Sequence, residues 1–132
     1  MIKLIFKKEL YEMANFSHDT TGEPFILWID EFGSERKIKH DLPRFKPEAN
    51  GIKMDIVIDG NDVRFVNPNP RKLKRFKYGK EALDFIRKFK EPLLMHWNRE
   101  IDTAQLGVIL RLVNKKKYKI KDAIDAVING DM

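Results

Sequence analysis

The stretch that decides the fold is Tyr78–Trp97, which reads YGKEALDFIRKFKEPLLMHW. Its large apolar residues recur at three- and four-residue spacing, and they are Leu83, Ile86, Phe89, Leu93 and Trp97. At 3.6 residues per turn this spacing gathers them on one side of a helix, while most of the charged residues fall elsewhere. The stretch is therefore predicted to be an amphipathic helix. Its apolar stripe needs a partner surface, which the rest of the chain must supply.

Helical patterns continue towards the C-terminus. Pro92 is predicted either to kink the helix or to open a second helix at its first turn, where a missing N–H has little effect. Two segments follow, Leu93–Ile101 and Thr103–Val113, and Asp102 or Thr103 is the candidate N-cap of the second. A last short helix is predicted from Ile120, Ile124, Val127 and Ile128, and Gly130 is expected to end it.

The residues before the organising stretch favour strands. Phe25–Phe32 (FILWIDEF) is dense in β-branched and aromatic side chains and precedes a Gly-Ser turn signal. Apolar residues alternate along 52–58, Asp59-Gly60-Asn61 supplies a turn, and a second apolar run follows at 63–66. Residues 52–66 are therefore predicted to form a β-hairpin.

Three further segments have weaker patterns. Met1–Phe16 is predicted to be a short strand that runs into a helix, and Ser17–Pro24 is predicted to be a loop. Leu42–Pro47 (LPRFKP) is predicted to be extended, because a proline disfavours helix in the residue before it.

The order of the elements indicates the fold class. Strands are expected mainly in residues 1–66 and helices mainly in residues 78–130. This order predicts an α+β fold, with a small, mainly antiparallel sheet packed against the C-terminal helices. A length of 132 residues is ordinary for one domain, so residues 1–132 are expected to be a single domain.

The composition argues against several kinds of site. The chain has no cysteine, which excludes disulfides, thiolate metal sites and thiol nucleophiles. No apolar run reaches the length of about 18 residues that a membrane span needs. The acidic residues and histidines match neither a calcium-binding loop nor a zinc-protease motif. We therefore expect a cytoplasmic protein with no metal, no cofactor and no membrane partner.

The net charge of +6 is concentrated in the second half of the chain. Residues 1–66 carry 10 Lys and Arg against 12 Asp and Glu, whereas residues 67–132 carry 16 against 8. Arg71–Lys90 alone holds nine basic and two acidic side chains. Such a run can attract a polyanion through counterion release, but it can also be a solvated helix face.

The densest part of this run mixes cations with aromatic residues. We predict a surface for nucleic acid or another partner that consists of Arg71, Lys72, Lys74, Arg75, Phe76, Lys77 and Tyr78, together with Lys115, Lys116 and Lys117. Phosphate contacts would give affinity, and the aromatic faces would stack on bases. Alternatively, Phe76 and Tyr78 pack this segment onto the core. The connection around Lys115–Lys119 is expected to be longer than the turn of a helix-turn-helix motif.

A second candidate site surrounds His40. If Leu42–Lys46 lies at a sheet edge, Arg44 and Lys46 project from one face and can hold a phosphate, while His40 transfers a proton in RNA cleavage. The alternative is that the charges and prolines of this strand protect an exposed edge against aggregation.

The order of LWIDEFG, HDLPRFK, a hairpin and FIRKFKEPLLMHW resembles a family of small bacterial domains of unknown function. In that family a strand leads to a Pro-Pro-His-Phe-His-like motif, a β-hairpin and a helix pair with a Leu-Leu-x-x-Trp signature. Its members often lie beside genes that look like toxin–antitoxin partners. The resemblance covers about Ile26–Trp97, and the matching residues are Pro43, Phe45, Leu93, Leu94 and Trp97. Arg44 and Lys46 stand where the motif has histidines, so no role of those histidines transfers to this chain.

Three hypotheses of function follow. The first is a small basic binding module, not an enzyme, that docks on nucleic acid or a nucleic-acid-associated protein through its C-terminal half. The second is a toxin–antitoxin-type, metal-independent ribonuclease that uses His40, Arg44 and Lys46. The third is a bacterial or phage accessory protein that inhibits or regulates a host-defence protein by direct contact. The sequence favours a binding module over an enzyme.

Overall fold

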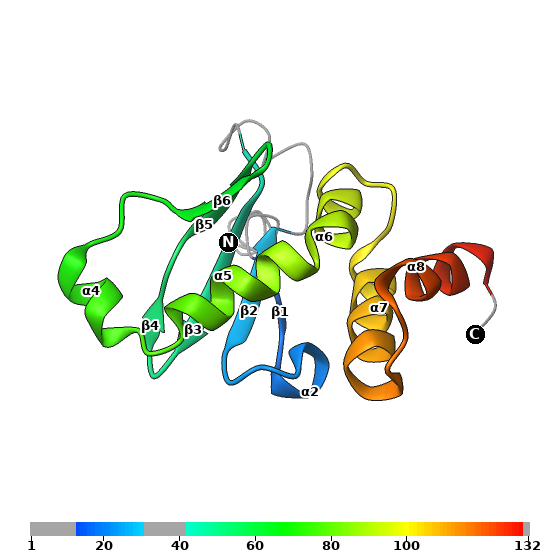
Figure 1. The fold of residues 1–132 in the computed structure, drawn as a ribbon, viewed down its shortest axis with the longest axis horizontal. Coiled ribbons are helices and arrows are strands. Elements are labelled where there is room, and N and C mark those ends of the chain that lie inside the picture. The colour runs from blue at the N-terminus through cyan, green and yellow to red at the C-terminus, as the bar shows by residue number, and fades with distance from the viewer. Residues whose placement is uncertain (1–12, 31–41, 131–132) are drawn as a thin grey trace, which may run out of the picture.

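The computed structural model describes residues 13–30 and 42–130, which form an antiparallel sheet and a set of helices (Figure 1). Across the sheet the strands are β1 (Met13–Phe16), β2 (Ile26–Asp30), β3 (Arg44–Ala49), β5 (Ile56–Asp59) and β6 (Asp62–Phe65), and β4 (Ile52–Lys53) also pairs with β3. All the strand pairs are antiparallel. The sheet belongs to the N-terminal half and most helices to the C-terminal half, so the predicted α+β class is confirmed.

The predictions for the first 24 residues needed correction where the structure describes them. Most of Met1–Phe16 lies outside the described residues, and its last four residues form β1 instead of a helix. The segment predicted to be a loop contains a one-turn helix, α2 (His18–Thr21), which ends at Gly22. Gly22 has a φ of 71°, a left-handed conformation that glycine adopts without strain.

β3 pairs with β4 and then with β5 in one continuous register, with no residue inserted or skipped between the two. The gap between β4 and β5 lies opposite Pro47, which has no N–H to donate to the ladder. Met54 still donates its N–H to the Pro47 carbonyl oxygen at 2.9 Å. The strand predicted over 52–58 is therefore confirmed, with a local interruption that proline chemistry explains.

Two tight turns join the central strands. Asn50 and Gly51 both have positive φ, 53° and 76°, and they connect β3 to β4 as a two-residue loop of the I′ kind. Gly60, with a φ of 62°, begins the two-residue loop between β5 and β6. The second loop confirms the predicted hairpin. The first was not predicted, although Asn-Gly is a strong hairpin signal.

As a result, β3 lies inside the sheet, with β2 on one side and β4 and β5 on the other. The condition set for the second candidate site, that Leu42–Lys46 lies at a sheet edge, is therefore not met. This position also removes edge protection as an explanation of the charges there. Phe45 and Pro47 are buried, whereas Arg44 and Lys46 alternate with them and are partly exposed.

The predicted long helix is broken in two. α5 (Gly79–Lys88) and α6 (Lys90–Trp97) meet at Phe89, which is not helical. In a continuous helix Pro92 would lack the hydrogen bond to the Lys88 carbonyl, and its ring would crowd that oxygen. Pro92 therefore stands in the first turn of α6, which confirms the second of the two predicted alternatives. α6 ends at Trp97, earlier than the predicted Ile101.

Three other helices complete the described C-terminal half: α4 (Pro70–Arg75), α7 (Thr103–Lys116) and α8 (Ile120–Asn129). Asp102 caps α7, as predicted, and forms a reciprocal capping box with Gln105. Gly130 ends α8 in the left-handed conformation, also as predicted. α4 was not predicted. None of the described helices is both long and apolar enough to span a membrane.

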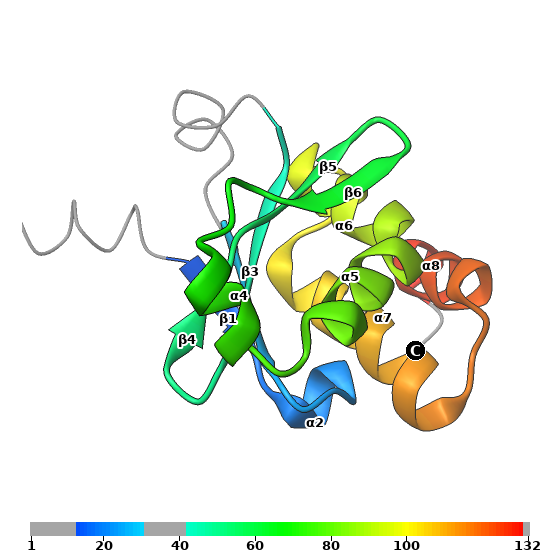
Figure 2. The same cartoon turned by 60° about the vertical axis from the view of Figure 1, so that its left-hand side comes forward.

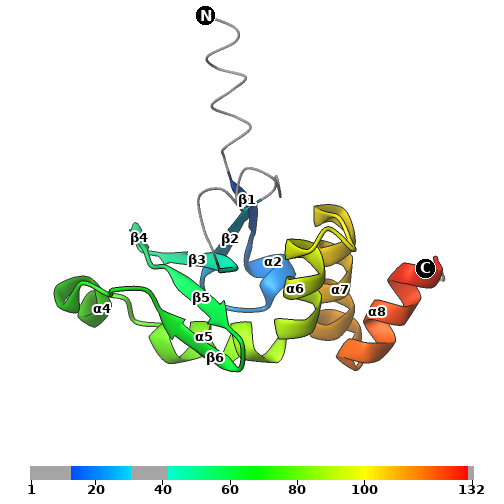
Figure 3. The same cartoon turned by 90° about the horizontal axis from the view of Figure 1, so that it is seen from above.

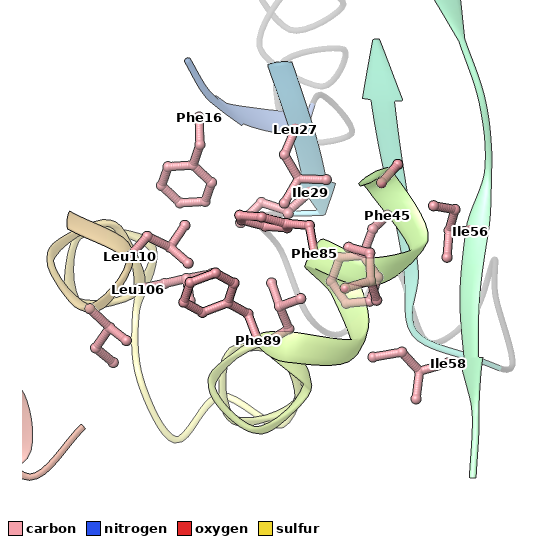
Figure 4. Close-up of a cluster of buried hydrophobic side chains, with 14 of the residues drawn as sticks. Phe16, Leu27, Ile29, Phe45, Ile56, Ile58, Phe85, Phe89, Leu106 and Leu110 are labelled. Carbon is pink, nitrogen blue, oxygen red and sulfur yellow. The ribbon is translucent and has the colours of Figure 1, made fainter. Parts of the chain in front are cut away.

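The core lies between the sheet and α5, α6 and α7 (Figures 1 and 3). Figure 4 shows Leu27 and Phe45 of the sheet in the same cluster of buried side chains as Phe85 and Phe89. The Phe85 and Phe89 ring centroids are 4.7 Å apart, and Phe89 is fully buried. The apolar stripe predicted for the organising stretch therefore finds its partner surface in the sheet.

A polar contact joins α2 to α7. The Asn114 side-chain amide donates to the carbonyl oxygens of Thr20 and Thr21 at 2.9 and 2.7 Å. These bonds satisfy carbonyl groups at the end of α2 that have no partner within so short a helix. The contact therefore fixes the start of β2 relative to the helical half of the molecule.

Candidate nucleic-acid interface

The local sequence around α4 explains why this helix forms. Asn69 caps it, because its side-chain oxygen accepts the backbone N–H groups of Arg71 and Lys72 at 3.0 and 3.3 Å. Pro70 follows at the first helical position, where its missing N–H has no consequence. Leu73 is partly buried against the core, but no residue of α4 is fully buried. The helix is thus held on one side and open to solvent elsewhere.

The open sides of α4 are cationic. We call the exposed cations of this segment the α4 cluster, and they are Arg71, Lys72, Lys74, Arg75 and Lys77. No acidic residue occurs between Val63 and Lys80. Within the described part of the chain, no member of the α4 cluster forms an ion pair. The cluster is therefore a concentrated positive surface without internal neutralisation.

Three of the four remaining cations of the run Arg71–Lys90 have structural contacts, whereas Lys80 is exposed. Arg87 donates to the Val63 carbonyl oxygen at 3.4 Å and holds the β5–β6 hairpin against α5, and Lys90 donates to the Gly60 carbonyl oxygen and holds the hairpin against the start of α6. The Lys88 ammonium lies 5.3 Å from the centre of the Phe89 ring. The basic run therefore divides into a free first half and a second half that supports the fold.

The aromatic residues of the predicted surface are less available than the cations. Phe76 is 4% exposed and belongs to the core, so it offers no face to a base. This burial corrects the stacking role expected for Phe76 and agrees with the alternative that it packs the segment onto the core. Tyr78 is only partly buried, and its ring meets the Phe76 ring edge to face at 6.4 Å.

The second predicted cluster lies far from α4. Lys115 and Lys116 end α7, and Lys117 follows with a φ of 60°. Figures 1 and 3 place α7 and α8 at one end of the long axis and α4 at the other. Figure 2 gives another view of α4, next to β4. The structure thus separates the ten predicted residues into two groups that cannot contact one short ligand together.

The cluster at the end of α7 is also partly neutralised. The Lys115 ammonium lies 3.4 Å from the Asp19 carboxylate, and the Lys117 ammonium donates to the Asn114 carbonyl oxygen at 3.3 Å. The connection to α8 has three residues, which corrects the expectation of a longer one. However, the exposed residues of α8 include Asp122 and Asp125, which repel phosphates.

The residues of the second candidate site are only partly described. His40 lies outside the described residues. Arg44 and Lys46 share the outer face of β3, but the Lys46 ammonium is 3.8 Å from the carboxylate of Asp55, which lies in the gap between β4 and β5. Such cross-strand pairs are common on solvent-facing sheets. The described residues contain no group of three His, Asp or Glu side chains that could hold a metal ion.

Sequence reasoning missed a hollow next to the α4 cluster. It has a volume of about 250 Å³ and is lined by residues from three distant segments, among them His18, Ile26, Glu48, Asn50 and Tyr78. A second hollow of about 580 Å³ lies at the connection between α6 and α7, where His96 is buried and its Nε2 is 2.9 Å from the Thr103 hydroxyl. Of the segments that line the first hollow, the Asn50-Gly51 turn has a local sequence signal, but the hollow itself depends on the fold.

No protein-family model matches this chain, and no match was found among curated proteins or solved structures. The resemblance to small bacterial domains therefore rests on its short motifs alone. Function has to be argued from the surface of the protein itself.

Proposed function

We propose that this protein is a nucleic-acid-binding module that holds the phosphate backbone of its ligand on the α4 cluster. The observation that carries the proposal is a set of five exposed cations without an ion pair in the described residues, on a segment with no acidic side chain. Cations in such numbers bind polyanions by releasing the counterions that the polyanion had condensed.

The arrangement of the cations on α4 gives a physical reason for a ligand. Arg71, Lys74 and Arg75 are three and four residues apart, so they are neighbours on one side of the helix. Like charges at this spacing destabilise a helix by a few tenths of a kcal/mol per pair. A bound phosphate backbone would convert this repulsion into attraction. The two arginines can also contact phosphate oxygens with two hydrogen bonds each.

The two basic ends of the molecule allow a matched test. The variant Arg71→Gln, Lys74→Gln, Arg75→Gln and the variant Lys115→Gln, Lys116→Gln, Lys117→Gln each lose three positive charges. Binding of a fluorescent oligonucleotide is measured by anisotropy for both. We expect the α4 variant to bind about a hundredfold more weakly at ~0.1 M salt, because three phosphate contacts are lost. The α7 variant should bind like the unmodified protein, and the proposal fails if the α7 variant is the one that loses binding.

The accessory-protein and ribonuclease hypotheses predict different results when the purified protein is examined for bound partners and for RNA cleavage. A protein partner that stays bound to the purified protein after nuclease treatment would support an accessory protein that acts by direct contact. Shortened RNA in the binding mixture, abolished by Arg44→Ala with Lys46→Ala, would support the ribonuclease. For the binding module we expect RNA of unchanged length to be bound to the purified protein. Nuclease treatment should remove this RNA and leave no protein partner behind.

A further inference from the structure

The hollow beside Tyr78 joins the α4 cluster directly. Lys77 is the last member of the cluster, and the next residue, Tyr78, lines the hollow. The other lining residues belong to the segment from α2 to the start of β2 and to the end of β3 with the turn that follows it. A strand of nucleic acid that lies on α4 and continues towards Tyr78 would reach this hollow.

The lining of the hollow is part apolar and part polar. Pro24, Ile26 and Ala49 contribute apolar surface, and Tyr78 contributes a partly exposed aromatic ring. A nucleobase has the same division, since its faces are apolar and its edge carries hydrogen-bonding groups. Base–aromatic stacking is the usual way in which single-stranded nucleic acid is held without reading its sequence.

The polar groups of the hollow have defined orientations. His18 Nδ1 lies 2.8 Å from the Glu23 carbonyl oxygen, and a carbonyl only accepts, so Nδ1 is the donor. In the neutral ring His18 Nε2 is then an acceptor. The Glu48 carboxylate accepts the Trp28 indole N–H at 2.7 Å, which fixes its position while leaving it further acceptor capacity. Two acceptors at the hollow suit the amino group on the edge of cytosine, adenine or guanine.

We propose that this hollow binds one unpaired, amino-bearing nucleobase of a single strand whose phosphates lie on the α4 cluster. The inference rests on the proposed function, and it adds the class of ligand. In a duplex the bases are stacked and paired and cannot enter the hollow. The protein should therefore prefer a single strand to a duplex, and oligo-dC to oligo-dT, which has a carbonyl oxygen in place of the amino group.

The test compares Tyr78→Leu and Tyr78→Phe with the α4 variant, using fluorescent oligo-dC. Tyr78→Leu should weaken binding about tenfold at every salt concentration, because it removes stacking and no charge. Tyr78→Phe keeps the ring and its packing, so it should bind like the unmodified protein. The α4 variant should lose affinity most at low salt. If Tyr78→Leu binds normally while the α4 variant does not, the hollow is not a base site but the proposed function stands.

A direct measurement avoids the risk that Tyr78→Leu disturbs the fold. Oligo-dC with one 5-iodocytosine is irradiated in complex with the unmodified protein, and the cross-linked residue is identified by mass spectrometry. We expect the cross-link at Tyr78 or at His18. Cross-links found only on α4 would overturn the base site and leave the phosphate site intact. Cross-links only on α7 or α8 would overturn both.

Discussion

Glu23 illustrates how single charges are balanced at the contact between the α2–β2 segment and α5. Burial raises the pKa of the Glu23 carboxyl above its ordinary value of 4.5, Lys88 partly opposes this shift, and Glu81 and Asp84 add to it. The folded protein therefore holds the Glu23 proton more tightly than the unfolded chain does. Its stability falls as the pH rises through the interval between the ordinary and the raised pKa.

Replacing Glu23 with Gln removes this ionisation. We expect Glu23→Gln to raise the melting temperature at pH ~7, where the unmodified carboxylate is charged, and to leave it unchanged at pH ~3.5, where both states are protonated. Thermal unfolding followed by circular dichroism at the two pH values measures the effect. Glu91→Gln, at an exposed position of α6, controls for the loss of one acid. An equal gain at both pH values would argue against the assigned cause.

Residue-level burial also decided which predicted contacts were available. The cations of the α4 cluster were identified from the sequence because long charged side chains rarely become buried. Phe76 and Tyr78 have similar sequence surroundings, yet one lies in the core and the other lines a hollow. The burial of each ring depends on segments that are distant in the sequence. A local sequence pattern therefore could not predict which of the two rings is buried.

At the scale of elements, the helices depend on their ends as much as on their apolar faces. Asp102 accepts the Gln105 N–H at 2.7 Å, and the Gln105 side chain accepts the Asp102 N–H at 2.9 Å. This capping box orients α7, whose buried residues Leu106 and Leu110 contribute to the core beside Phe89. A defect at the cap should therefore lower the stability of the whole molecule.

We expect Asp102→Ala to lower the free energy of unfolding by about 1 kcal/mol. Asp102→Asn should lower it much less, because the Asn side-chain oxygen can also cap the helix. Urea denaturation followed by tryptophan fluorescence measures both values. A loss as large for Asn as for Ala would show that the charge of Asp102, and not its capping oxygen, carries the effect.

α4 and the turn between β3 and β4 were not predicted, although both have a local sequence signal. The Asn69-Pro70 pair is a regular helix start, and Asn50-Gly51 is a regular hairpin turn. The position of β3 in the sheet is different. β3 lies inside the sheet because it pairs with β2 on one side and with the strand after Asn50-Gly51 on the other. Its proline and its charged residues, however, are typical of an edge strand. Sequence pattern alone therefore could not place it.

At the scale of the whole molecule, the fold separates two basic regions that the sequence analysis assigned to one binding surface. The α4 cluster and the end of α7 lie at opposite ends of the long axis (Figure 1). The α4 cluster is followed in the chain by Tyr78, which forms the aromatic wall of a hollow. The sequence identified the two basic runs, but their distance from each other is a property of the fold.

The salt dependence of binding tests the central claim most directly. The logarithm of the affinity for a single-stranded oligonucleotide is plotted against the logarithm of the salt concentration, for the unmodified protein and for the α4 variant. Each lost phosphate contact should reduce the slope by about 0.7, so the α4 variant should have a slope smaller by about 2. Equal slopes for the two proteins, or an affinity of the unmodified protein that does not depend on salt, would contradict a phosphate-binding role for α4.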